Sequence, residues 1–456
     1  MARSVRLSVE EKLYGLALIW QEANYNFAFF DRAPGLDWDA SYREFIPQVI
    51  AAQDLDAYYN LLSRFTALLR DGHTYVISPK SLYLSLDRPK LMVMNIENRP
   101  IVTNASCTIG RRVPIGSELL EIDGSGAKQA LDTRVIPAVC ETTPHRLLDH
   151  ATARLLLGLQ GSKVRCRFHT PGGDSIEIAL VRNRRMDTDP WLRPHSIPFK
   201  WEFMYLDEKW LSEAPFSAFE FELLEGNVAY IALNSFREPT VAPSFTTKLP
   251  AIKDCAGLIL DLRKNHGGSD ATGYSIVSHF LNQPTETIRV QSPKHIASYK
   301  ASGRYLRDTP EDKVAGLDKR AREQLSCYRK QWMHKEGWGD VQPAHEILSL
   351  PTAILTSSET GSAAEDFVMA FESGGGKASR IGQSTAGSSG QPLGQELPGG
   401  GRLAICTIRM PWPEKVWRKG IEPHVCVEPT IQDIIGNQDR VLTTAVRYLG
   451  GKEGIA

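Results

Sequence analysis

The stretch at 352–371 constrains the fold most, because it joins the pattern of a buried strand directly to that of a helix. A short apolar run at 352–356 is followed by a polar, glycine-containing turn. Apolar residues then recur at helical spacing, as at Phe367 and Phe371. The pattern predicts a strand, a tight turn and a helix, with Ser362 at the helix N-terminus.

A serine at this position can have a chemical role. Ser362 would lie beside unpaired backbone N–H groups and the positive end of the helix dipole, which suits an oxygen that carries developing negative charge. The alternative is that Ser362 only caps the helix. Other parts of the sequence favour the chemical role.

Composition bounds the class of protein and its partners. A chain of 456 residues, 42% hydrophobic and 23% charged, is typical of a globular protein with two to four structural units. Lysine plus arginine balance aspartate plus glutamate at 53 each, which argues against a nucleic-acid or acidic-membrane partner. No run of eighteen apolar residues is present, so we expect no transmembrane helix.

Cysteine usage and the N-terminus bear on compartment and cofactors. The seven cysteines are scattered and form no C-x-x-C pair, so neither a zinc site nor a disulfide framework is indicated. The first residues lack the apolar core of a signal peptide. We therefore expect a cytoplasmic protein without metal or cofactor; a signal peptide removed upstream would instead indicate a periplasmic or secreted one.

Three regions differ in pattern. Residues 1–83 predict an N-terminal helical domain, in which Ser8 and Glu11 form a capping box and His73 follows a helix end in a turn. Residues 84–185 contain short β-rich runs separated by turn signals, which predicts a small separate domain.

Residues 186–456 predict an α/β core. The run at 256–262 is continuously apolar, as expected of a strand buried on both faces, and further strands are predicted at 228–233, 380–382 and 403–408. A charged, aromatic and partly helical insertion at about 283–345 is predicted to form a cap over the site.

Three features together fit acyl transfer, which needs a nucleophile, oxyanion donors and a base. Ser362 supplies a hydroxyl. Gly267 and Gly268 follow a buried strand, where glycine lets backbone N–H groups approach a ligand closely. His73 lies in a turn rather than an apolar run. Each feature alone also fits an ordinary cap, turn or surface histidine, and spacing cannot show that they meet.

Several motifs resemble those of the serine peptidases that include the tail-specific C-terminal processing proteases and the tricorn protease core. The resemblance covers most of the chain. In the core, the motifs are NVAYIALNSF at 227–236, LILDLRKNHGG at 258–268, GSAAE at 361–365, IGQST at 381–385 and GIEPH at 420–424. Upstream, they are LLRDGHT at 68–74, and VPIGSELLEIDG at 113–124 with LGLQGSKV at 157–164, which resemble parts of a PDZ domain. The resemblance implies a multidomain α/β protein with a Clp-protease/crotonase-like spiral core and a PDZ-like domain at 84–185.

The branch of this family decides the general base. Members of the dyad type carry a lysine after the serine, whereas this chain has no lysine between Lys377 and Lys415. The tricorn-like branch uses a histidine from the N-terminal region, and His73 fits that position. A histidine near its ordinary pKa suits a general base at neutral pH. The oxyanion would be held by the N–H of Gly267 or Gly268 together with that of Ala363.

The group that orients His73 is less defined. The resemblance implies a serine beside the histidine and a later glutamate, but Gly72 precedes His73 here. Asp71 or Thr74 could compensate, although both residue types also serve turns. Candidates for the glutamate are Glu422 first and Glu414 second; the alternative for each is a surface salt bridge. His266 is interpreted as a substrate-pocket residue.

We therefore predict a serine endopeptidase acting on peptides or protein C-terminal segments, with a homo-oligomer left open. One alternative is a non-catalytic binding protein of the same fold, for peptides or lipophiles such as retinoids. The other is a crotonase-type acyl-CoA enzyme, which also uses paired backbone N–H groups but would not need Ser362.

Overall fold

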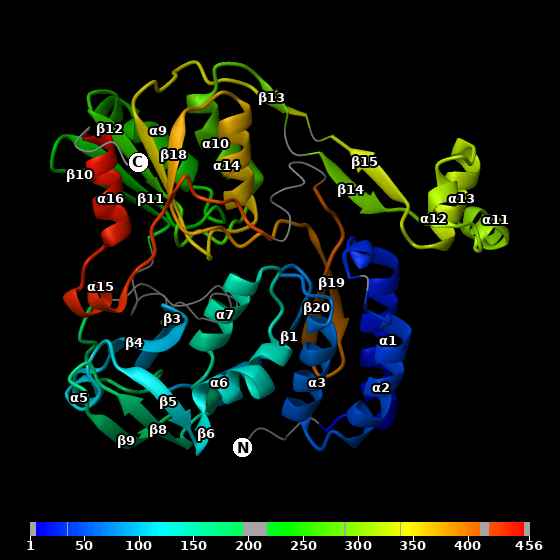
Figure 1. The fold of residues 1–456 in the computed structure, drawn as a ribbon, viewed down its shortest axis with the longest axis horizontal. Helices are drawn as coiled ribbons and strands as arrows, with labels where there is room; N and C mark the ends of the chain where they lie inside the picture. Colours follow the sequence, from blue (N-terminus) through cyan, green and yellow to red (C-terminus); the bar gives the residue numbers. More distant parts are fainter. Residues whose placement is uncertain are drawn as a thin grey trace. The chain divides into compact units, whose positions relative to one another are not determined.

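The computed structural model describes residues 6–33, 35–194, 217–286, 289–337, 339–410 and 419–450. The fold is a mixed α/β one, and the chain forms two compact units (Figure 1). Unit 1 comprises Met1–Pro79, Thr287–Gly339 and Ser389–Lys415. Unit 2 comprises Lys80–Glu286, Asp340–Ser388 and Val416–Ala456. These units group segments that are distant in sequence, and the three predicted domains stay a prediction.

Unit 1 begins with three helices, α1 (Val9–Asn26), α2 (Trp38–Ala51) and α3 (Leu55–Ala67). The predicted capping box opens α1: the Ser8 N–H donates to the Glu11 carboxylate at 2.7 Å, and the Glu11 N–H donates to the Ser8 hydroxyl at 3.2 Å. Because the four first N–H groups of a helix have no partner within it, this exchange stabilises the helix end.

Unit 1 also contains a small antiparallel sheet, in the order β1 (Tyr75–Ile77), β20 (Gly401–Cys406) and β19 (Pro392–Leu397). The strand predicted at 403–408 is therefore present as β20, but it pairs with β1 and β19 rather than with the parallel strands of the core. Its partner β19 is joined to it by a short turn that contains Gly399 and Gly400, both with φ of +90°, and such a turn favours antiparallel pairing.

The predicted insertion is partly helical, as expected. A hairpin of β14 (Val290–Pro293) and β15 (Met333–Glu336) leads into α11 (Ala297–Gly303), α12 (Glu311–Val314) and α13 (Lys319–Tyr328). Its function as a cap stays a prediction.

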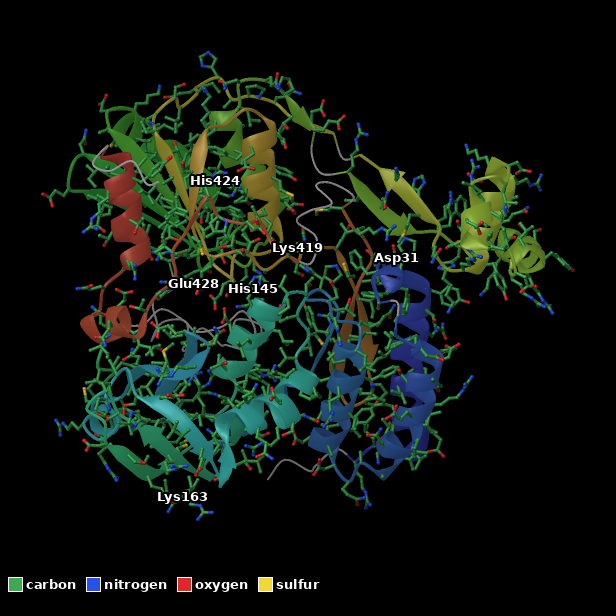
Figure 2. All side chains as sticks on the ribbon, in the orientation of Figure 1. Asp31, His145, Lys163, Lys419, His424 and Glu428 are labelled. Carbon is green, nitrogen blue, oxygen red and sulfur yellow. The ribbon has the colours of Figure 1, made fainter. Side chains whose placement is uncertain are left out.

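The first part of unit 2 is an antiparallel sheet. Its strand order is β3 (Leu91–Ile96), β4 (Arg99–Ala105), β5 (Glu118–Ile122), β8 (Lys163–His169) and β9 (Ser175–Val181), with β6 (Ser125–Gly126) paired to β5. Helix α7 (Pro144–Ala153) packs on β3 and carries His145 in its first turn (Figure 2). The strands predicted in this region from their β-rich runs are confirmed.

The second part of unit 2 is a six-stranded sheet. Its strand order is β10 (Phe219–Leu224), β11 (Val228–Leu233), β12 (Gly257–Asp261), β17 (Thr352–Thr356), β18 (Ala378–Gly382) and β21 (Val425–Cys426). Only β10 runs antiparallel to its neighbour. Every residue of β12 and β17 is buried, which explains their mainly apolar sequences, GLILD and TAILT.

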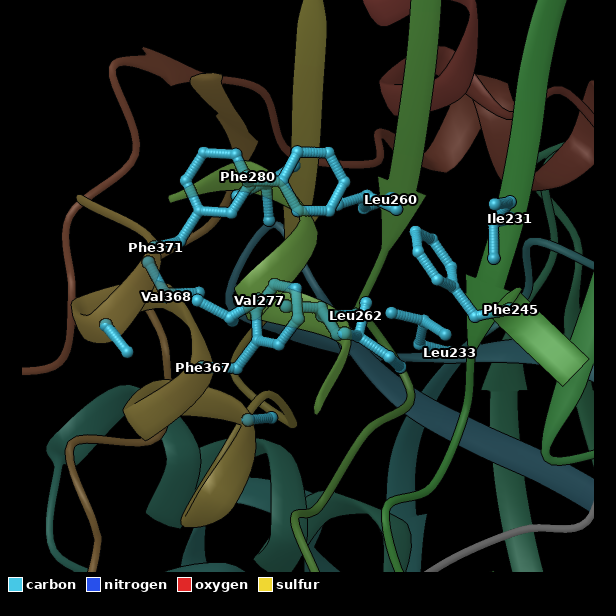
Figure 3. Close-up of a cluster of buried hydrophobic side chains, with 14 of the residues drawn as sticks. Ile231, Leu233, Phe245, Leu260, Leu262, Val277, Phe280, Phe367, Val368 and Phe371 are labelled. Atoms are coloured by element: carbon cyan, nitrogen blue, oxygen red, sulfur yellow. The ribbon is translucent and has the colours of Figure 1, made fainter. Parts of the chain in front are cut away.

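Helices cover both faces of this sheet. On one face, α9 (Val241–Lys253), α10 (Asp270–Val277) and α14 (Ala363–Ser373) contribute to a cluster of buried aromatic and aliphatic side chains (Figure 3). On the other face, α16 (Arg440–Leu449) packs through Val441 and Ala445. Because β11, β12, β17 and β18 are parallel, the loops that follow them meet at one edge of the sheet. In the described part of the chain, no helix is both long and apolar enough to cross a membrane.

The core behind Ser362 gives a stability prediction. Phe367 is fully buried in α14 and packs against Phe236 and Phe371 with ring centroids 5.6 and 6.2 Å away. Phe367→Ala would leave a cavity, so we expect the free energy of unfolding to fall by about 3–5 kcal/mol. Chemical denaturation checks this value. The control Leu223→Ala, at a side chain that is 56% exposed, is expected to change it by less than about 0.5 kcal/mol; equal losses for the two variants would contradict the prediction.

Candidate active site

Ser362 lies at the junction of β17 and α14, as predicted. The strand ends at Thr356, the six residues 357–362 form the connection, and the helix begins at Ala363. Ser362 itself has φ of +57° and ψ of −133°, a region that residues with a Cβ rarely occupy. Such strain costs on the order of 1–3 kcal/mol and is found preferentially at functional sites. A strained serine between strand and helix is the arrangement that exposes a nucleophilic hydroxyl in α/β-hydrolases.

The glycine turn after β12 lies directly against Ser362. A Cβ placed on Gly267 would be 2.6 Å from the Ser362 Cβ and 2.9 Å from the Ala363 nitrogen. Gly267 also has φ of +93°, so a side chain would be excluded by both space and backbone conformation. The structure therefore brings together the predicted nucleophile and the predicted glycine pair, which are distant in sequence.

Asn265 holds this turn in place. Its side chain is fully buried; Oδ1 accepts from the Gly267 N–H at 2.8 Å, and Nδ2 donates to the Leu233 carbonyl at 2.8 Å. Its backbone carbonyl accepts from the Gly361 N–H at 3.0 Å. Asn265 thus connects the end of β11, the glycine turn and the turn that precedes Ser362.

The N–H groups of the site differ in their partners. The Gly267 N–H already donates to the Asn265 side chain. Phe236 pairs with both neighbours of Gly268: its N–H donates to the Gly267 carbonyl and its carbonyl accepts from the Ser269 N–H, each at 3.0 Å. These two hydrogen bonds do not use the Gly268 N–H. Ala363 is the first residue of α14, so its N–H is one of the groups that a helix leaves without an internal partner.

Glu365, in the first turn of α14, organises the loop that faces Ser362. The carboxylate is 2% exposed and accepts from the Ser362, Gly387 and Ser388 N–H groups at 3.3, 2.9 and 2.9 Å, and from the Thr385 hydroxyl. The Ser388 carbonyl in turn accepts from the Ser362 N–H at 2.8 Å. Burial raises the pKa of Glu365, and these four hydrogen bonds oppose that rise. Nothing local in the sequence marks Glu365 for this role, although it is the last residue of the GSAAE motif.

His266 contacts the turn before Ser362. Its Nδ1 lies 3.1 Å from the Glu359 carbonyl and its Nε2 lies 3.7 Å from the Glu359 carboxylate. The ring is largely buried, with 15% of the side chain exposed. These contacts give His266 a structural place beside the glycine turn, and its predicted role in a substrate pocket stays a prediction.

His73 belongs to unit 1. It is 6% exposed and lies in the turn between α3 and β1, as predicted. A Cβ on Gly390 would be 3.3 Å from the His73 Cβ and Cγ, so that glycine lies directly against the ring. The backbone of His73 is fixed by Asp71, whose carboxylate accepts from the His73 N–H at 3.2 Å and from the Thr74 hydroxyl at 2.7 Å. The pairing of His73 with Ser362 stays a prediction.

Of the two glutamates predicted to orient His73, the structure describes Glu422 and not Glu414. Glu422 belongs to unit 2 and is exposed, and its backbone carbonyl accepts from the Arg380 side chain at 2.9 Å. Glu414 lies outside the described residues. Neither assignment goes beyond the sequence prediction.

Comparison with known proteins finds a family match over the region that contains this site. Residues 227–427, which include the glycine turn and Ser362, match the sequence model of peptidase family S41. No curated protein matches the chain in sequence.

Among solved structures, mature CPAF is similar with a TM-score of 0.69 at 15% identity, covering 98% of this chain and 99% of that one. A putative peptidase from Parabacteroides merdae has a TM-score of 0.53 at 17% identity, covering 99% and 100%. The photosystem II D1 C-terminal processing protease has 0.50 at 15% identity, covering 97% and 98%. At these identities, the likenesses show the fold.

The strained serine beside a glycine turn and the match over 227–427 define a serine-type peptidase. Residues 227–427 carry the match to peptidase family S41, and the similar solved structures span nearly the whole chain. The resemblance that the sequence motifs indicated is confirmed at this level.

Glu365 gives a prediction for the site. In Glu365→Gln, the amide NH₂ would face backbone N–H donors, and a buried donor would lose its acceptor. We expect the free energy of unfolding to fall by about 1–3 kcal/mol and peptide hydrolysis to decrease. The control Glu372→Gln lies on the same helix at a side chain that is 42% exposed, and its loss should stay below about 1 kcal/mol. Denaturation and turnover measured on the two variants check this, and indistinguishable variants would refute it.

Proposed function

We propose that this chain is an endopeptidase in which Ser362 attacks a peptide carbonyl and His73 acts as the general base. The observation that carries the proposal is the strained backbone of Ser362 at a helix N-terminus, with the glycine turn against its Cβ. Peptide or protein C-terminal segments are the proposed substrates, because the family includes C-terminal processing proteases.

The reaction uses this chain's own groups at each step. His73 takes the proton of the Ser362 hydroxyl as the oxygen attacks the carbonyl carbon, and the imidazolium then donates that proton to the leaving amine. The acyl ester on Ser362 is hydrolysed by a water molecule that the same histidine activates. This sequence is general acid–base catalysis combined with a covalent intermediate.

The N–H groups of Gly268 and Ala363 are proposed to hold the oxyanion. Gly267 was an equal candidate from the sequence, but its N–H donates to Asn265. A pair of backbone donors aimed at the developing charge is the usual means of stabilising a tetrahedral intermediate, and loss of one donor costs on the order of 100- to 1000-fold in rate.

One observation from the sequence and one from the structure support His73 as the base. No lysine occurs between Lys377 and Lys415, so the segment after Ser362 offers no dyad lysine. Ser388 bonds to the Ser362 N–H, Gly390 lies against the His73 ring, and these two residues are separated by one residue in the sequence. Asp71 and Thr74 are proposed to orient His73 through its backbone, and Glu422 is proposed as the further acidic group.

The finer fold assignment is part of the same proposal. The parallel strands of unit 2 with helices on both faces support a Clp-protease/crotonase-like core. The antiparallel sheet with α7 on β3 supports a PDZ-like domain at 84–185, in which the edge strand β3 would pair with a peptide by strand addition.

A fluorophosphonate probe tests the nucleophile and the base. We expect the probe to label Ser362, Ser362→Ala to abolish both labelling and hydrolysis of labelled casein without unfolding, and His73→Ala to slow labelling by about 100- to 10,000-fold. Ser373→Ala, at an exposed serine of the same helix, is the matched control and should label normally. Absence of labelling in the wild type would favour a binding protein of the same fold, and unchanged labelling of His73→Ala would require another base.

The base also predicts the pH dependence. An ordinary histidine has a pKa near 6.5, and only its neutral form accepts the Ser362 proton. We therefore expect the labelling rate constant to fall below about pH 6 and to level off above neutrality. Labelling rates between pH 5 and 9, with circular dichroism showing a folded protein throughout, measure this; a rate that stays constant down to pH 5 would argue against a histidine base.

A further inference from the structure

Helix α7 contacts the turn that precedes Ser362. The Ser358 hydroxyl donates to the Asp149 carboxylate at 2.5 Å, and the Arg146 guanidinium lies 3.4 Å from the Glu359 carboxylate. Glu359 is three residues before Ser362. Two polar side chains of one helix are therefore attached to the segment that leads directly into the nucleophile.

The start of the same helix contacts the loop on the other side of Ser362. The Thr143 hydroxyl donates to the Ala386 carbonyl at 3.0 Å, and the His145 Nε2 lies 2.8 Å from the Thr385 carbonyl. Thr385 also donates its hydroxyl to the Glu365 carboxylate. The α7 region thus touches both segments that flank Ser362.

Arg146 is the ionic centre of these contacts. It is 5% exposed, and its Nε lies 3.5 Å from the Glu141 carboxylate, so the guanidinium is shared between Glu141 and Glu359. Burial lowers the pKa of His150 to about 4. The neutral His150 ring lies 2.7 Å from the Glu141 carboxylate through Nδ1. Because it carries no charge, it does not compete with Arg146 as the cation that pairs with Glu141. Because Arg146 is buried, losing an acidic partner would leave part of its charge uncompensated, and the ion pair therefore holds Glu359 beside Arg146.

Glu359 extends the contact to the glycine turn. Its carboxylate and its carbonyl both face the His266 ring, at 3.7 and 3.1 Å. His266 directly precedes Gly267 and Gly268. A continuous set of contacts therefore runs from α7 through Glu359 to the turn that supplies the proposed oxyanion donor.

We propose that Arg146 is a positioning residue of the peptidase: by fixing Glu359, it sets the turn before Ser362 relative to the glycine turn. The inference rests on the function proposed above. Arg146 touches no reacting atom; it acts on where the nucleophile and the oxyanion donors lie. Because a displacement of about 1 Å at reacting atoms can cost about 100-fold in rate, a small shift of Glu359 is sufficient.

The test separates positioning from a purely structural role. Arg146→Met and Glu359→Gln are expected to lower the maximal rate constant of fluorophosphonate labelling by about 10- to 100-fold. The probe concentration at half-maximal rate should change less than about twofold, and Arg146→Lys should recover part of the rate. The double variant should be no slower than the slower single variant, because both substitutions remove the same Arg146–Glu359 ion pair.

Arg99→Met is the matched control. Arg99, in β4, also forms an ion pair with a glutamate, Glu118 in β5, but its side chain is 44% exposed. Its labelling should equal that of the wild type. Rates are compared per folded molecule, counted by the final extent of labelling. Wild-type labelling kinetics in a folded Arg146→Met, or in Glu359→Gln should Arg146→Met fail to fold, would overturn the inference alone. A wild-type enzyme that does not label Ser362 would overturn it together with the proposed function.

Discussion

The arrangement around Ser362 depends on one buried carboxylate. Glu365 accepts hydrogen bonds from four donors, one in Ser362 itself and three in the loop at 385–388. A buried charge is tolerated only where such donors surround it, so the loop and the helix start must adopt one geometry together. The strained backbone of Ser362 persists because these bonds, and the Ser388 carbonyl, hold it from several sides.

The parallel sheet supplies the frame for this geometry. It places the ends of β11, β12, β17 and β18 at one edge, where Asn265 links the end of β11 to the two turns that carry Gly267 and Gly361. From the antiparallel region, α7 adds an ionic attachment through Arg146 and Glu359. Ser362 and the glycine turn are thus positioned by hydrogen bonds from the sheet edge and the 385–388 loop, and by an ion pair from α7.

Sequence reasoning succeeded where the signal is local. The strand, turn and helix around Ser362, the buried strand at 256–262 and the capping box at Ser8 each follow from residue periodicity or a short motif. It was less informative where partners are distant: nothing local distinguished Gly267 from Gly268, and Glu365 resembled any acidic residue in a first helical turn. The sequence signal that could have identified both residues is their position in motifs of the resembled family: Asn265 in LILDLRKNHGG and Glu365 in GSAAE.

The sequence by itself therefore determined the class of protein. The signals were short motifs in a fixed order, a glycine pair after a buried strand and a serine before a helix. Each of these signals is a pattern of neighbouring residues. Tertiary structure alone decided which N–H groups remain outside other hydrogen bonds, which carboxylate is buried and which helix contacts the turn before Ser362. Those properties depend on contacts between residues up to about 240 positions apart, such as Thr143 with Ala386, and no periodicity in a single chain records such pairings.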